Sequence, residues 1–121
     1  MHKYQELKLW QKGIDLVVNV YKAVAEFPKE EKYGLTSQMK RSAVSIPSNV
    51  AEGAGRNHDK EFVQFLSVAN GSSFELETQV IVANKLQMLS KELSDDLCRQ
   101  LNEIQKMNYK LQLTLASNKQ K

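Results

Sequence analysis

The amino-acid sequence predicts an all-α protein, an antiparallel up-and-down four-helix bundle whose second helix is kinked at a proline. Apolar residues recur at alternating spacings of three and four in four successive segments, which is typical of amphipathic helices. The 121 residues contain only five glycines and two prolines, so long uninterrupted elements are expected. No segment shows the strict alternation of a half-buried strand. Four such helices joined by short connections pack most simply as a bundle, formed here as one domain over residues 1–121.

The first helix is expected over residues 6–26. It should stop at Phe27-Pro28, because proline lacks an amide donor and restricts the residue before it. Two apolar stripes run along this helix, and we interpret the first as the core seam, with Trp10 packed in it rather than stacked on a base. The second makes the apolar surface wider than one bundle seam, so we expect something besides the core of the chain to cover it. The first stripe is Leu7, Trp10, Ile14, Val17, Tyr21 and Val24, and the second is Leu9, Leu16, Val20 and Ala23.

The second helix is expected to begin with Thr36 or Ser37 as its cap and to end near Gly53 or Gly55. Pro47 lies inside it, where it removes one backbone hydrogen bond and should kink the helix or divide it in two. We expect nearby hydroxyl groups to satisfy the carbonyl that this proline leaves free. The candidates are Ser42, Ser45 and Ser48.

The third helix is expected over residues 59–89, with Asp59 as its cap. Gly71 lies in its interior at a cost of about 1 kcal/mol relative to alanine, which favours the close approach of another helix or backbone there. The fourth helix is expected to open with Ser94-Asp95-Asp96, where Ser94 caps the backbone. Residues 116–121 should fray. The core seam of the fourth helix is Leu97, Leu101, Ile104, Asn108, Leu111 and Leu115.

The composition narrows the class of protein. The formal net charge of +3 is modest. No apolar run approaches the roughly 18 residues of a membrane span, and the amino terminus lacks the apolar centre of a signal peptide, so we expect a cytoplasmic protein with no membrane partner. The lone Cys98 and two histidines cannot build a zinc site, and neither a metal nor a cofactor is expected.

Catalytic groups are hard to find. His58, Asp59 and Glu61 lie close in sequence, but residues at a helix start usually face solvent or serve as caps. The Gly53–Arg56 segment resembles the start of a phosphate loop, yet no strand precedes it, and a helix-ending turn is the better interpretation. Cys98 is interpreted as a partly buried small residue rather than a reactive thiol. We therefore expect no enzymatic activity.

Arg41 and Arg56 are the strongest binding candidates. They flank the segment that contains Pro47, and the arginine fork suits phosphate or carboxylate recognition better than lysine does. The alternative is that both are ordinary surface residues or partners in ion pairs between subunits. Several weak sites of this kind can act together in an oligomer.

Residues 38–53 carry an unusual signature, in which a proline inside a helix is followed by Ser-Asn-Val-Ala-Glu-Gly. The chain resembles the family of bacterial four-helix-bundle proteins encoded in intervening sequences of 23S rRNA genes. The resemblance continues through Leu9-Trp10-Gln11, Tyr33-Gly34-Leu35, Gly55-Arg56 and the segment from Glu61 to Thr78.

This resemblance implies a ring-shaped homopentamer, similar to the accessory protein of diversity-generating retroelements, which partners a reverse transcriptase and binds nucleic acid. By the same analogy, Lys40, Arg41 and Arg56 are the positions for contact with RNA or a protein partner. The family implies no settled activity for the intervening-sequence members. The residues that it implies shape the kinked helix are Ser45, Pro47, Asn49, Glu52 and Gly53.

The sequence thus favours a non-enzymatic, oligomeric protein that binds RNA or a nucleoprotein. The alternative is a structural or protein-interaction oligomer without nucleic-acid binding, supported by the two apolar stripes of the first helix.

Overall fold

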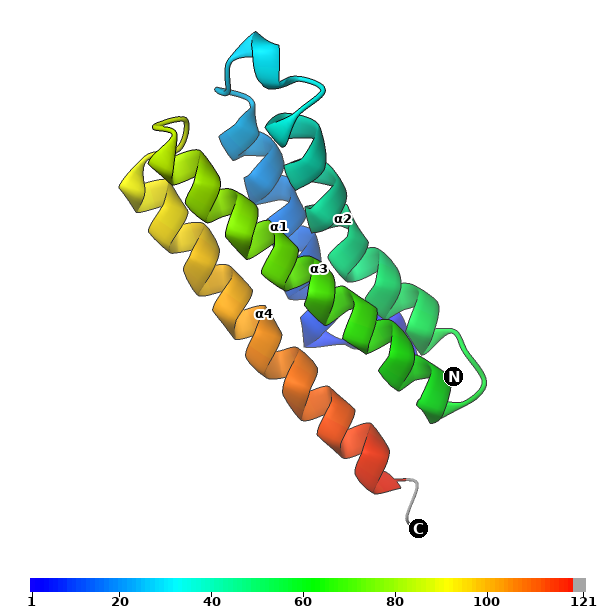
Figure 1. The fold of residues 1–121 in the computed structure, drawn as a ribbon. Coiled ribbons are helices and arrows are strands. Elements are labelled where there is room, and N and C mark those ends of the chain that lie inside the picture. The colour runs from blue at the N-terminus through cyan, green and yellow to red at the C-terminus, as the bar shows by residue number, and fades with distance from the viewer. Residues whose placement is uncertain (119–121) are drawn as a thin grey trace.

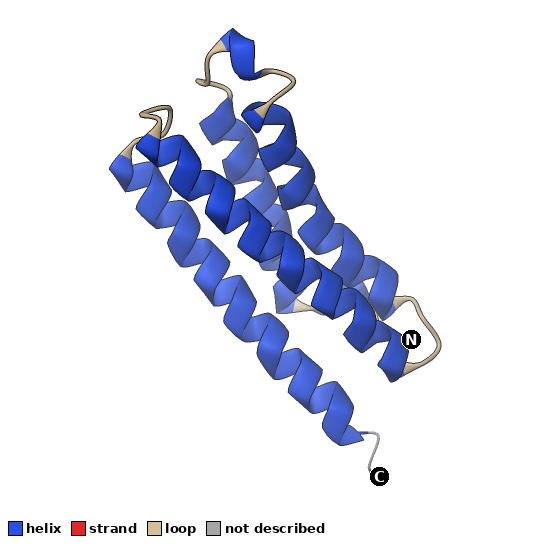
Figure 2. Cartoon of the chain, viewed as in Figure 1, coloured by secondary structure: helices blue, strands red, loops and turns tan. Residues whose placement is uncertain are grey.

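The computed structural model describes residues 1–118 and contains four long helices and no strand within that range (Figures 1 and 2). A short 3-10 turn, Tyr4–Glu6, precedes α1 (Lys8–Val24), and a second one, Lys29–Glu31, lies between α1 and α2. The other helices are α2 (Leu35–Ala54), α3 (Asp59–Lys85) and α4 (Lys91–Asn118). The predicted all-α four-helix bundle is confirmed.

Each helix packs against its two neighbours, in the cyclic order α1, α2, α3, α4 and back to α1. The amino terminus and the carboxyl-terminal end of α4 lie at the end of the bundle where α2 turns into α3 (Figure 1). None of the described helices combines the length and the apolar character that crossing a membrane requires. Residues 116–118, which were expected to fray, continue α4, and residues 119–121 lie outside the described part of the chain.

The predicted roles of the two stripes on α1 are only partly right. In the stripe predicted as the core seam, Val24 is buried, and Leu7, Trp10 and Val17 pack partly buried against the core. The stripe that contains Leu9, Leu16 and Val20 is buried, whereas Ile14 is 37% and Tyr21 44% exposed. The reason lies in Gly13, which shares the buried face. An added Cβ at Gly13 would come within 3.2 Å of the Pro47 Cβ atom, so α1 and α2 touch closely along this face. Ile14 and Tyr21 of the first stripe are left exposed.

Gly53 allows a similarly close approach between α2 and α3. A Cβ atom there would lie 2.6 Å from Cβ of Phe65 and 2.9 Å from Cδ1 of Phe62, which is closer than atoms can pack. Gly71 differs, because no described atom outside its own helix backbone and chain neighbours lies within 4 Å of an added Cβ. The close approach expected at Gly71 is therefore absent among residues 1–118.

Three predicted helix caps are wrong. Leu35 N–H donates to Oε1 of Glu31 at 3.1 Å, so a carboxylate from the preceding turn caps α2 in place of Thr36 or Ser37. At α3 the N-cap is His58, without a side-chain bond, and Asp59 is the first helical residue. For α4 the hydroxyl of Ser90 accepts from Leu93 N–H at 3.1 Å, which places Ser94 inside the helix.

The third helix ends four residues earlier than expected. Gln87 adopts a left-handed φ of 63°, and its N–H donates to the Asn84 carbonyl at 3.0 Å. Met88 N–H donates to the Ala83 carbonyl at 2.9 Å, which completes a Schellman motif. Glycine usually occupies the left-handed position, so a glutamine there leaves no signal in the sequence.

The predicted seam of α4 is confirmed. It includes Asn108, which is only 1% exposed, yet its amide donates to the Leu66 carbonyl of α3 at 2.9 Å and its Oδ1 atom accepts from Gln112 at 2.6 Å. A buried amide is tolerated when its polar atoms have partners. Asn108 therefore ties α4 to α3.

Replacing Gly53 with alanine should destabilise the protein by about 1–3 kcal/mol, the usual cost of overpacking. The matched control is Gly71→Ala, which meets open space in a helix interior and should raise the free energy of unfolding by about 0.5–1 kcal/mol. Urea unfolding followed by circular dichroism measures both values. Equal effects of the two substitutions would contradict the packing assigned to Gly53.

Ser94→Ala should stabilise the fold by up to about 1 kcal/mol, because the buried Ser94 hydroxyl has no hydrogen-bond partner among residues 1–118 and its desolvation is uncompensated. Ser73 provides the comparison, since its buried hydroxyl donates to the Asn70 carbonyl at 2.7 Å. Thermal unfolding should place the Ser94→Ala variant above the wild type and the Ser73→Ala variant below the Ser94→Ala variant. The opposite order would show that Ser94 has a partner.

Candidate functional site

The two neighbouring basic residues of α2 point in different directions. Arg41 is exposed on the outer face and forms no ion pair within 4 Å among the described residues. Lys40 is half-buried, with its Nζ atom 4.8 Å from the centre of the Tyr21 ring on α1. Successive residues of a helix diverge by about 100°, which explains the separation. Arg41 is thus free to meet a ligand, while Lys40 belongs to the boundary between α1 and α2.

Arg56 directly follows Gly55, which ends α2 as the predicted helix-ending turn. Its guanidinium lies 4.8 Å from the centre of the Phe65 ring, and Nη2 is 4.0 Å from Oε1 of Glu52. These contacts direct the guanidinium along the junction of α2 and α3. The helix rises about 1.5 Å per residue, so Arg41 and Arg56 are separated by roughly 20 Å along the helix axis. The three predicted basic residues therefore form no single cluster.

The signature residues organise the centre of α2. The Ser45 hydroxyl lies 2.8 Å from that of Ser72 on α3, and the Asn49 amide donates to both the carbonyl and the hydroxyl oxygen of Ser45. Pro47 packs on Gly13, and α2 runs through the proline without being divided. Among the described residues, no serine hydroxyl bonds to the Ala43 carbonyl that Pro47 leaves free, contrary to expectation. The signature thus positions α2 between its neighbours.

The structure shows an apolar groove that the sequence did not place on the surface. It runs between α1 and α2 with a volume of about 290 Å³, and its wall is mostly apolar. Trp10, Ile14 and Val17, which line the groove, belong to the stripe predicted as the core seam. The groove is lined by Tyr4, Trp10, Ile14, Val17, Val44, Pro47, Ser48 and Ala51.

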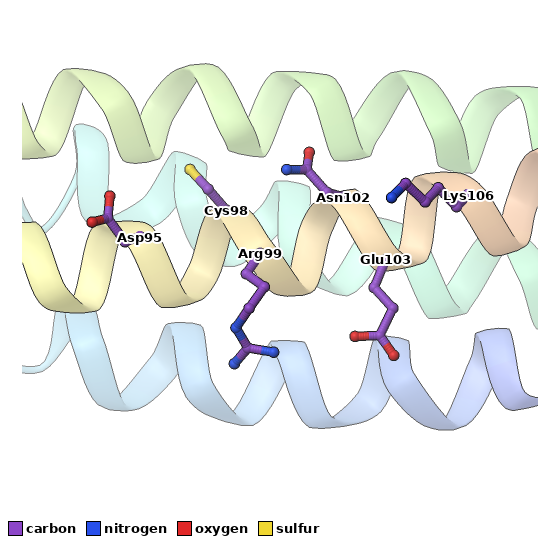
Figure 3. Close-up of a pocket in the computed structure, with 6 residues that line it drawn as sticks. All are labelled: Asp95, Cys98, Arg99, Asn102, Glu103 and Lys106. Carbon is purple, nitrogen blue, oxygen red and sulfur yellow. The ribbon is translucent and has the colours of Figure 1, made fainter.

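A polar depression of about 620 Å³ lies on α4 (Figure 3). Cys98 and Asn102 point from it towards α3, and Arg99 and Glu103 point towards α1. The Lys12 ammonium lies 2.8 Å from the Glu103 carboxylate and lowers the pKa of that group through hydrogen bonding and charge. Arg99 pairs with Asp96. Glu103, Arg99 and Asp95 of this depression are therefore paired with residues just outside it, namely Lys12, Asp96 and Lys91.

Cys98 is partly buried, as expected. Burial is the main cause that raises the pKa of its thiol, and the charges of Glu77 and Asp95 raise it further. A thiol with a raised pKa is a weak nucleophile, because only the thiolate attacks. Cys98 is therefore suited to packing rather than to covalent chemistry.

The polar residues at the start of α3 do not form an acid–base pair. Asp59 accepts from Nε2 of His2 at 3.1 Å, whereas the side chain of the exposed His58 makes no hydrogen bond to another described residue. The His2 ring also lies 5.1 Å from Phe62. Over residues 1–118, no group of three or more His, Cys, Asp or Glu side chains could hold a metal ion. At this end of the bundle, the amino terminus packs against the start of α3.

Comparison with known proteins agrees with this architecture. A solved structure from Bacteroides thetaiotaomicron, described as a protein of unknown function from the S23 ribosomal protein family, superimposes with a TM-score of 0.78. The two sequences are 19% identical, and the match covers 86% of this chain and 97% of the other, so the likeness concerns the fold. No curated protein matches the sequence. Residues 5–110 match the family model described as 23S rRNA-intervening sequence protein, and the chain therefore belongs to that family.

Proposed function

We propose that this chain is a non-enzymatic, self-associating binding protein whose ligand is RNA or a ribonucleoprotein. The observation that carries the proposal is the open apolar groove between α1 and α2, together with Arg41 of α2, which forms no ion pair with residues 1–118. Arg41 lies one turn from Val44, which lines the groove, so each copy in an assembly would place a cation beside its contact surface.

The groove supports self-association because it exposes side chains that a lone bundle would be expected to bury. Ile14 and Val44 are 37% and 39% exposed, and they line the groove together with the half-buried Trp10. Tyr21, about two turns after Ile14 on α1, is 44% exposed and extends the apolar face beyond the groove. Contiguous exposed apolar surface is typical of protein interfaces. An aromatic anchor such as Trp10 often contributes most of the binding energy in such a patch.

A second apolar stripe lies on α3, diagonally across the bundle from α1. Phe74 is 53% and Ile81 46% exposed, and their spacing of seven puts them on one face of the helix. The exposed apolar faces of α1 and α3 differ and lie on opposite sides of the bundle, which favours a head-to-tail contact between copies. Such contacts close into a ring when the rotation from one copy to the next divides a full turn evenly. The family resemblance implies five copies, and this geometry supports a ring of that kind.

The arginines support RNA as the ligand. A single Arg41 or Arg56 would bind phosphate weakly, but several copies held in one assembly gain affinity through avidity. Arg56 is already oriented by Phe65, which lowers the cost of fixing its fork. A modest net charge is therefore compatible with RNA binding.

The alternative is an oligomer that binds only protein. The extent of exposed apolar surface favours it, since Phe74 and Ile81 on α3 could meet a different protein as well as a second copy. Pull-down after nuclease treatment separates the two functions. A protein partner that survives nuclease, with no bound RNA, would favour the alternative.

Ile14→Asp should convert the oligomer into a monomer, because a carboxylate in the groove would be desolvated without a partner on association. Light scattering at micromolar concentration gives the mass, and circular dichroism checks that helicity is kept. Leu93→Asp is the control, since Leu93 is also exposed, at 49%, but lies outside the groove. A wild-type protein that is already monomeric would refute self-association.

Arg41→Ala and Arg56→Ala should each weaken binding to a structured RNA between about tenfold and 150-fold, since a charge-assisted hydrogen bond contributes about 1.5–3 kcal/mol. Binding should also weaken steeply as salt rises. Fluorescence anisotropy at several salt concentrations measures both effects, and Lys85→Ala, an exposed cation at the far end of α3, is the control. Absent or salt-independent binding by the oligomer would contradict RNA recognition.

A further inference from the structure

The charge of α4 changes abruptly along its length. Its first half, residues 91–103, carries four acidic and two basic side chains, whereas no Asp or Glu follows Glu103 in the sequence. The lysines that follow within the described helix are Lys106 and Lys110. The carboxyl-terminal half of α4 is therefore purely basic.

These lysines share an outward face with an aromatic side chain. Lys106, Tyr109, Lys110 and Leu113 are spaced at i, i+3, i+4 and i+7, and all four are exposed. Tyr109 is 65% exposed, the largest value for an aromatic residue within the four long helices. The opposite side of α4 is the buried seam of Ile104, Asn108 and Leu115. We call the exposed set Lys106, Tyr109, Lys110 and Leu113 the α4 ridge.

No ion pair with the described residues neutralises the α4 ridge, although the Glu77 carboxylate of α3 lies nearby and accepts from Nε2 of Gln105 at 2.9 Å. Glu103, the last carboxylate before it, is held by Lys12 of α1 at 2.8 Å. Lys106 and Lys110 form no ion pair within 4 Å with the described residues. Because α1 and α4 run in opposite directions, Lys8, one turn before Lys12, lies level with the turn after Glu103 and adds a further positive charge.

Tyr109 also has no structural partner that would explain its position. No aromatic ring stacks on it, and its hydroxyl makes no hydrogen bond with the residues that the structure describes. An exposed aromatic ring flanked by cations one turn apart matches what unpaired nucleotides require, namely a flat surface for the base and ammonium groups for phosphates. In a duplex the base faces are already stacked and cannot be reached.

We propose that the α4 ridge binds single-stranded RNA, with one base stacked on Tyr109 and the neighbouring phosphates held by Lys106 and Lys110. This proposal rests on the proposed function, and adds to it a second contact surface and a strand type. The ridge lies on a different helix from the groove and from the α3 stripe.

The experiment measures the anisotropy of fluorescently labelled oligouridylate, which forms no structure of its own, with the full-length protein. Tyr109→Ala should weaken binding between about fivefold and 150-fold, the usual effect of losing one base stack, while Tyr109→Phe should bind like the wild type. Lys106→Ala and Lys110→Ala should each reduce the slope of log affinity against log salt by about 0.7. All three side chains are exposed, so the fold should persist, and circular dichroism checks it.

Tyr33→Ala is the matched control. Tyr33 is 87% exposed, and Lys32 lies 5.3 Å from its ring centre, but this pair lies in the connection at the other end of the bundle. Unchanged binding by the Tyr33→Ala variant, together with loss in the Tyr109→Ala variant, supports the α4 ridge. Equal affinities of the Tyr109→Ala variant and the wild type overturn it.

The two proposals fail in different ways. If Arg41→Ala weakens binding to structured RNA while Tyr109→Ala leaves oligouridylate binding unchanged, the α4 ridge is refuted and the proposed function stands. If only the ridge variants lose affinity, the ridge is supported and the role of the arginines is refuted. Polyglutamate that binds as tightly as oligouridylate, with no effect of Tyr109→Ala, would assign the ridge to acidic protein and overturn the RNA proposal. No binding of either RNA by the wild type overturns both.

Discussion

The close packing of α2 against both of its neighbours is the constraint on which the rest of the bundle depends. Gly13 lets α1 approach Pro47, and Gly53 lets α2 approach Phe62 and Phe65 of α3. A further methyl group would clash at Gly53 and would be tight at Gly13. Protein interiors are packed at the density of organic crystals, so these two contacts determine how far and at which face the three helices meet.

The exposed surface follows from this packing. Since Gly13 turns the face with the smaller residues of α1 towards Pro47, the face that carries Trp10, Ile14 and Tyr21 is left at the edge of the bundle. Lys40 is drawn onto the Tyr21 ring at the same edge. The apolar groove is thus a consequence of how the core is built, which connects a family signature in α2 with a surface suited to self-association.

Electrostatics separate the remaining surface into two regions. Around Arg99 and Glu103 the charges pair with each other, and the lowered pKa of Glu103 reflects the ammonium of Lys12 beside it. Beyond Glu103 the only charged residues of α4 are lysines, and they form no ion pair with the described residues. Arg41 on α2 also forms no ion pair with the described residues. Surface ion pairs contribute little to stability, so the unpaired cations are the ones available to an anionic ligand.

The sequence by itself determined the helical class, the termination of α1 near Phe27 and of α2 at Gly55, and the seam of α4 with its buried Asn108, because hydrophobic period and helix-breaking residues act locally. The helix caps could not be predicted from the sequence. Glu31 and Ser90 cap α2 and α4, and both lie in turns whose geometry depends on the folded structure. Gln87 ended α3 without a glycine. Only the tertiary structure decided which stripe of α1 is buried and where Lys40, Arg41 and Arg56 point. Both stripes have the same period, and the choice between them depends on the fit of Gly13 to Pro47, a contact between residues far apart in the chain.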